Sequence, residues 1–74
     1  MTRAKFKCNS VEKRLGWGEH KYLWAAKFTP VTSGSDENLK FYAATPTGLI
    51  EVSSVKNDFF EVGLEYYVDF TPTI

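Results

Sequence analysis

The stretch Arg3-Ala4-Lys5-Phe6-Lys7-Cys8, residues 3–8, decides the fold because its side chains alternate strictly between basic and apolar. A period of two is the signal of a β-strand with one buried face. The alternation changes phase at Asn9 and Ser10, and a β-bulge there would return Val11 to the apolar face. The sequence therefore predicts a first strand that is basic on its solvent face and carries a bulge near its middle.

The last alternating segment of the chain carries acids where the first carries bases. Tyr66, Val68 and Phe70 are expected to face inward, with Glu65 and Asp69 on the polar face. Opposite charges on neighbouring strands contribute about 0.2–1 kcal/mol per pair. We therefore expect the first and last strands to pair antiparallel, with acid facing base, and to close a small barrel.

The whole chain shows the same division of charge. Residues 1–29 hold seven basic against two acidic side chains, and residues 30–74 hold two against seven. The two parts are +5 and −5, and they cancel. A chain divided in this way is suited to bind itself, either across its own sheet or across a subunit interface.

Two further strands are predicted, over residues 21–31 and 49–55. The first has apolar side chains on both faces, as in a central strand or one covered by another subunit. Strict alternation of Tyr22, Trp24 and Phe28 assigns these aromatics to the core.

The connections between the strands contain a turn and a long polar loop. The turn over residues 15–19 holds Trp17 between two glycines, and this indole is expected either to fold over the core edge or to stand exposed. In the loop over residues 33–48, Ser33 or Ser35 is placed to cap a short helical turn. The fold class is therefore all-β: a small antiparallel barrel or sandwich of four to five strands, with one or two short helical turns, in a single domain over residues 1–74.

Size and composition favour a homo-oligomer. A chain of 74 residues buries only about 60% of its unfolded surface, and small scaffolds usually need a further stabilising device. One cysteine and one histidine provide neither a disulfide within the chain nor a zinc site, so no cofactor or metal is expected. Twelve aromatic residues and self-association remain as the stabilising devices. No apolar run reaches membrane-spanning length, and no membrane partner is expected.

The residue inventory argues against an enzyme. Nucleophilic catalysis needs a nucleophile, a base and a group that orients the base. Cys8 occupies a buried strand position and His20 follows a glycine turn, so the two are not expected to meet. No glycine spacing matches a phosphate-binding loop. A net charge of zero also argues against non-specific binding of nucleic acid.

The loop over residues 33–48 is the predicted ligand site, because it is long for so small a domain and dense in hydrogen-bonding groups. Hydroxyls, an amide, aromatic rings and a lysine suit a nucleotide-like ligand. The expected roles are phosphate contacts from Lys40 or Arg14, base stacking on Phe41, Tyr42 or Trp17, and hydrogen bonds from Asn38, Thr45 and Thr47. The competing interpretation is a capped helical turn followed by a proline turn, which uses many of the same residues.

Alternating lysine and aromatic residues over 21–24 permit a second kind of site. Such a pattern is typical of the stacking platforms that hold single-stranded nucleic acid on small barrels. Core packing explains Trp24 better, because its strand keeps a strict alternation.

Four segments of the chain resemble a family of short, mostly uncharacterised proteins of tailed bacteriophages. They are Arg3-Ala4-Lys5-Phe6-Lys7, Glu37-Asn38 with Phe41, Ala44-Thr45-Pro46-Thr47-Gly48, and the ending Gly63-Leu64-Glu65-Tyr66-Tyr67-Val68-Asp69-Phe70-Thr71-Pro72. The resemblance covers nearly the whole chain and implies a phage protein made in the cytoplasm of the infected bacterial host, which fits the lone Cys8. Small phage proteins of this kind are often accessory or counter-defence factors, and several are oligomers that take up nucleotide signals.

The leading hypothesis combines these features. It is a non-catalytic phage accessory protein that binds and sequesters a small nucleotide-type immune signal of bacterial defence as a homo-oligomer. The first alternative is a single-stranded nucleic-acid-binding small β-barrel. The second is an interaction protein that blocks a host protein or decorates the virion.

Overall fold

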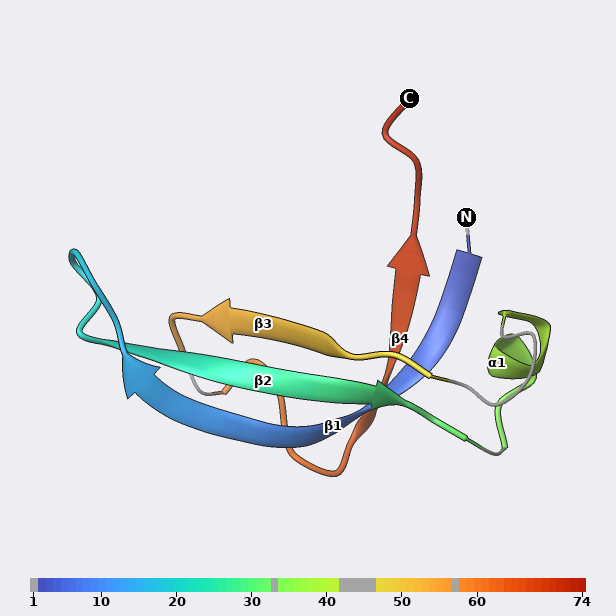
Figure 1. The fold of residues 1–74 in the computed structure, drawn as a ribbon, viewed down its shortest axis with the longest axis horizontal. Helices are drawn as coiled ribbons and strands as arrows, with labels where there is room; N and C mark the ends of the chain where they lie inside the picture. The colour runs from blue at the N-terminus through green and yellow to red at the C-terminus, as the bar shows by residue number, and fades with distance from the viewer. Residues whose placement is uncertain (1, 33, 42–46, 57) are drawn as a thin grey trace.

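The structure is a computed structural model that describes residues 2–32, 34–41, 47–56 and 58–74 (Figure 1). Within these residues it contains β1 (Thr2–Leu15), β2 (Tyr22–Pro30), α1 (Asp36–Phe41), β3 (Ile50–Ser54) and β4 (Glu65–Phe70). The strands form one antiparallel sheet in the order β3-β2-β1-β4. This is the predicted all-β fold with a short helical segment.

Strand β1 serves two neighbours along its length. It pairs with β4 from Thr2 opposite Phe70 to Lys7 opposite Glu65, and with β2 from Phe6 opposite Pro30 to Leu15 opposite Tyr22. The β1–β2 register shifts between Cys8 and Ser10, so the predicted bulge is confirmed. Figure 1 shows β1 curving from β4 toward the β1–β2 hairpin. The bulge therefore lies just beyond the β1–β4 register, inside the part of β1 that pairs with β2.

The predicted pairing of the first and last strands is confirmed, but it does not close a barrel. Arg3 lies opposite Asp69 in the register, so base faces acid as expected. Closure would need β3 to pair with β4, and these two strands are the edges of the described sheet. The sheet is therefore a curled half-barrel that stays open between β3 and β4.

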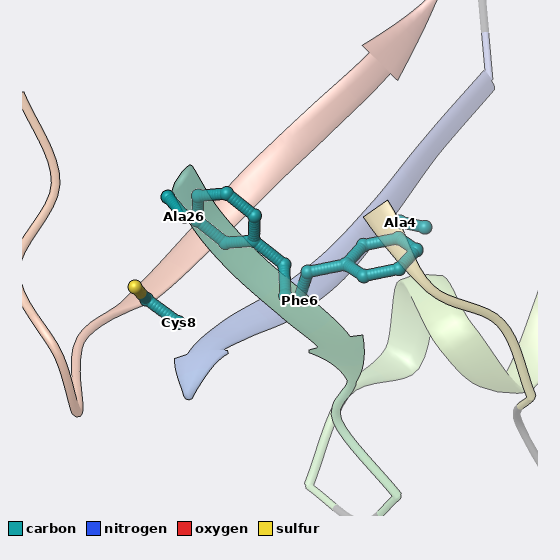
Figure 2. Packing of buried hydrophobic residues seen from close by; sticks show 5 residues of the cluster. Ala4, Phe6, Cys8 and Ala26 are labelled. Carbon is teal, nitrogen blue, oxygen red and sulfur yellow. The ribbon is translucent and has the colours of Figure 1, made fainter. Parts of the chain in front are cut away.

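The core lies inside the curl, where β1, β2 and β4 overlap (Figure 2). The half-buried Phe60 and Tyr66 pack against the buried Phe28, and the three rings meet edge to face with centroids 5.0–5.8 Å apart. Edge-to-face pairs contribute about 0.5–1.5 kcal/mol beyond the area that they bury. The buried members of the core are Ala4, Phe6, Cys8, Ala26 and Phe28.

Three aromatics that the sequence assigns to the core lie at its margin. Tyr22 is half-buried at the hairpin end of β2, opposite Leu15. Phe70 is 47% exposed, because its partner position is Thr2 at the very end of the sheet. Trp24 shares the inner face with Phe28 but is only half-buried. It lies in the hairpin beyond Lys7, where β4 no longer runs beside β1. Phe70 therefore lies on the predicted face with Tyr66 and Val68 but is not buried there, and Trp24 packs less than expected.

Helix α1 begins as the sequence indicates. The Asn38 N–H donates to Ser35 Oγ at 3.2 Å, so Ser35 is the N-cap. Asp36 and Glu37 occupy the first turn, where the helix dipole favours acids. Ser33, the other candidate cap, lies outside the described residues. The helix packs beside β1.

Candidate functional site

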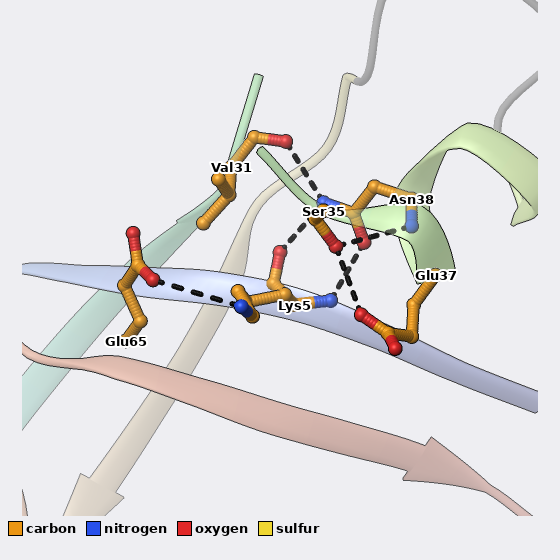
Figure 3. Close-up of polar contacts among 6 residues, drawn as sticks. All are labelled: Lys5, Val31, Ser35, Glu37, Asn38 and Glu65. Atoms are coloured by element: carbon orange, nitrogen blue, oxygen red, sulfur yellow. Dashed lines mark hydrogen bonds and ion pairs between the residues drawn. The ribbon is translucent and has the colours of Figure 1, made fainter. Parts of the chain in front are cut away.

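Asn38, expected to contact a ligand, is part of the fold. Its side chain is buried at 3% exposure, and its Oδ1 accepts the Lys5 N–H at 2.7 Å (Figure 3). Its Nδ2 donates to the carbonyls of Lys5 and Val31, each at 2.8 Å. The amide thus uses both of its donor hydrogens and one acceptor position within the chain. It ties α1 to β1 and to the end of β2.

Of the other predicted loop residues, the structure describes the side chains of Lys40 and Thr47. Lys40 is exposed in the last turn of α1, and Thr47 is exposed in the coil before β3. Phe41 ends α1, and its side chain, Tyr42 and Thr45 lie outside the described part of the chain.

Arg14 lies in the β1–β2 hairpin and is already paired with carboxylates. Its Nη2 lies 2.9 Å from Glu12 Oε2, and its Nη1 lies 3.4 Å from Glu51 Oε2. The hydrogen bond to Glu12 raises the pKa of Arg14 and lowers the pKa of Glu12. A phosphate at Arg14 would therefore have to displace acids from the guanidinium.

The hairpin turn holds Trp17 in a defined conformation. The Gly16 N–H donates to the Lys21 carbonyl at 2.8 Å, and the His20 N–H donates to the Trp17 carbonyl at 3.2 Å. Gly18 has φ of 64°, and no described non-glycine residue has a positive φ. In the turn from Trp17 to His20, only the first central residue has a positive φ, which is the pattern of a type II′ turn. A Cβ at Gly16 would overlap the His20 carbonyl oxygen, so only glycine fits there.

Aromatic and cationic side chains are exposed around this turn. Trp17 is 78% exposed. The Lys13 Nζ lies 4.0 Å from the centroid of the Tyr22 ring, and the Lys21 Nζ lies 5.4 Å from it. Among the described residues neither lysine forms an ion pair. We call Lys13, Trp17, Lys21 and Tyr22 the hairpin-tip surface.

Sequence reasoning identified Trp17 but missed the pairing of Lys13 with Tyr22. The bulge could have revealed this pairing, because it moves every later residue of β1 to the opposite face. Lys13 therefore lies opposite Trp24 on the inner face, and Leu15 lies opposite Tyr22. Lys13 thus does not belong to the basic solvent face that Arg3, Lys5 and Lys7 form.

The hairpin-tip surface is suited to a ligand with a flat ring and a negative charge. An exposed indole can stack on a base. The two ammonium groups, which form no ion pair with the described carboxylates, can meet phosphate oxygens. Within the described ranges no three His, Cys, Asp or Glu side chains gather to hold a metal ion. Of the described helical residues, none form a segment long and apolar enough to cross a membrane. Comparison with protein families, with curated proteins and with solved structures finds no match for this chain.

Proposed function

We propose that this chain is a non-catalytic protein that binds a small nucleotide-type ligand through its hairpin-tip surface and acts as a homo-oligomer. The observation that carries the proposal is Trp17, a large side chain left 78% exposed on a turn of fixed geometry. An exposed aromatic ring buries a large apolar area when a partner stacks on it. This feature is typical of a binding residue.

The charges around Trp17 favour an anionic ligand. Residues 13–24 hold three bases (Lys13, Arg14 and Lys21) against one acid, Glu19. Arg14 is neutralised by its carboxylate partners, so Lys13 and Lys21 supply the available positive charge. A nucleotide offers a ring for the indole and a phosphate for the ammonium groups.

A small ligand suits this chain better than a long nucleic acid. The affinity of proteins for nucleic-acid strands comes mainly from many phosphate contacts and the counterions that they release. This chain has no net charge, and four of its bases (Arg3, Lys5, Arg14 and Lys27) lie in ion pairs. The phage resemblance supports the further proposal that the ligand is an immune signal that the protein sequesters in an infected bacterium.

Calorimetry and thermal shift with a panel of mononucleotides, linear dinucleotides and cyclic dinucleotides test the proposal. We expect at least one nucleotide to bind the wild type and Trp17→Ala to weaken that binding at least tenfold without a large change in Tm. Leu39→Ala is the matched control, because Leu39 is 79% exposed on α1, outside the hairpin, and should leave binding intact.

Two results would contradict the proposal. The first is a panel that gives neither heat nor thermal shift. The second is nucleotide binding that Trp17→Ala leaves unchanged, which would place the site elsewhere. Sub-micromolar binding of a random single-stranded oligonucleotide, with a steep salt dependence, would identify the ligand as a nucleic-acid strand instead of a small nucleotide.

A further inference from the structure

An apolar groove runs along the open side of the half-barrel. It has a volume of about 250 Å³ and separates the two edge strands of the described sheet. Ile50 and Val52 line it from β3, Tyr66 and Val68 from β4, and Phe28 and Phe60 complete the lining. None of these side chains carries a charge. In a closed barrel, β3 and β4 would pair along this groove. We call it the seam groove.

The chain exposes more surface than a compact monomer of its size. Its accessible surface is 5544 Å², whereas the general scaling with mass gives about 4,600 Å² for 8.4 kDa. Its radius of gyration is 14.2 Å, against about 11 Å for a compact chain of this length. The excess is about 900 Å², and a standard interface buries about 800 Å² on each partner. The surplus surface is therefore of the size that one dimer contact removes.

We propose that a second copy of this chain covers the seam groove, so that two half-barrels bury their open sides against each other. The inference rests on the proposed homo-oligomeric state and does not depend on the ligand. A sheet with one apolar face must bury that face against another layer, and the described part of this chain forms a single sheet.

Charge favours a second copy over a charged partner. A two-fold interface brings the same patch of both subunits together, so a charged patch would meet its own sign. The groove is uncharged, and the nearest charged side chains of the edge strands are paired within the chain. Asp69 binds Arg3 at 2.7 Å, Glu65 lies 3.9 Å from Lys5, and Glu51 lies 3.7 Å from Lys27. The groove can therefore face its own copy without bringing unpaired like charges together.

Sedimentation equilibrium of the full chain and of two lysine variants tests the inference. Val52 is 38% exposed in the groove, whereas Ser53, the next residue of β3, points to the opposite face. We expect the wild type to show at least twice the 8.4 kDa of one chain. Val52→Lys should weaken the association at least a hundredfold, because it buries two ammonium groups at the interface. Ser53→Lys adds the same charge to the same strand and should associate like the wild type.

The outcomes separate the interface from the oligomer. A wild type that stays at the mass of one chain at about 100 μM, where a specific dimer would form, overturns both. An oligomer that Val52→Lys leaves intact overturns the seam-groove interface and keeps the oligomeric state. Circular dichroism checks that each variant is folded. If Val52→Lys does not fold, Val68→Thr is measured in its place, because threonine keeps the shape of the valine side chain. We again expect a weaker association. An unchanged association would overturn the interface.

Discussion

Asn38 completes the hydrogen bonding of β1 at the point where β2 ends. Pro30 is the last residue of β2, and beyond it the Val31 N–H bonds to the Lys5 carbonyl at 3.0 Å. The Lys5 N–H would then lack a partner. The Asn38 Oδ1 accepts this N–H, and the Asn38 Nδ2 donates to the carbonyls of Lys5 and Val31. An amide is the right group because it offers donors and an acceptor in one plane.

Replacing Asn38 should destabilise the fold without any effect that depends on a ligand. Asn38→Ala leaves the Lys5 N–H and two carbonyls without this partner, at about 2–4 kcal/mol. Asn38→Asp should be at least as harmful, because a carboxylate cannot donate to the two carbonyls. Chemical denaturation measures both, with Lys40→Ala on the exposed side of α1 as the control. An Asn38→Ala protein as stable as Lys40→Ala would show that water replaces the amide.

Phe28 should be the most costly aromatic to remove. It is almost fully buried and contacts both Phe60 and Tyr66 edge to face. Phe28→Ala is expected to cost about 3–5 kcal/mol, enough to unfold a domain of this size. Trp24→Ala and Phe70→Ala should each cost less, because both side chains keep part of their surface in water. Thermal melts rank the three variants, and a larger loss at Phe70 than at Phe28 would contradict this account of the core.

Strand β1 sets the arrangement of the other elements. Its period of two, its bulge and its charge were readable in the sequence, because each depends on residues that are adjacent in the chain. The antiparallel pairing with β4 was readable too, since the acids of one strand match the bases of the other. The open seam was not readable, because it depends on how far β4 extends along β1, and no local pattern fixes that length. The buried role of Asn38 was missed because it depends on partners outside its own helix. Lys5 lies 33 residues earlier in the chain, and Val31 lies just after β2.

The pairing of β1 with β4 should depend on pH through Asp69. The Arg3 guanidinium donates to both carboxylate oxygens, at 2.7 and 3.1 Å, and lowers the pKa of Asp69 below its ordinary 3.8. A carboxyl with a lowered pKa in the folded state stabilises the fold above its unfolded pKa, and this stabilisation is lost as the pH falls through the folded value. Asp69→Asn should therefore lower the Tm at about pH 7 and cease to differ from the wild type near pH 2.

Asp58→Asn is the control for this comparison. Asp58 is exposed in the β3–β4 connection and forms no ion pair among the described residues. Its variant should follow the wild type at every pH. A difference between Asp69→Asn and the wild type that stays constant with pH would mean that the ion pair does not contribute through its charge.

The hairpin turn should tolerate one glycine substitution better than the other. At Gly16 a Cβ overlaps the His20 carbonyl, whereas at Gly18 no atom is near but φ is positive. Gly18→Ala should cost about 1 kcal/mol, and Gly16→Ala should cost about 1–3 kcal/mol and change the environment of Trp17. Thermal melts and tryptophan fluorescence measure the two effects. Equal costs at the two positions would contradict the turn geometry.

At the scale of the whole molecule, the fold is a single curled sheet 17 Å across its shortest axis. The described helix covers only part of β1, so the inner face of the sheet stays partly open along the seam groove. A chain that completes its core by association should gain stability with concentration. We expect the Tm to rise by several degrees between about 1 and 100 μM. A Tm that does not change over this range would contradict association coupled to folding.

The two ends of the chain leave the sheet side by side. Thr2 pairs with Phe70, and the hairpin turn lies at the opposite end of the fourteen-residue β1 (Figure 1). A tether, label or fusion partner on either end therefore sits away from Trp17. A protein anchored to a sensor chip by its termini should therefore leave the hairpin accessible to the solution. A short linker that joins residue 74 to residue 2 should give a circular chain with an undisturbed sheet.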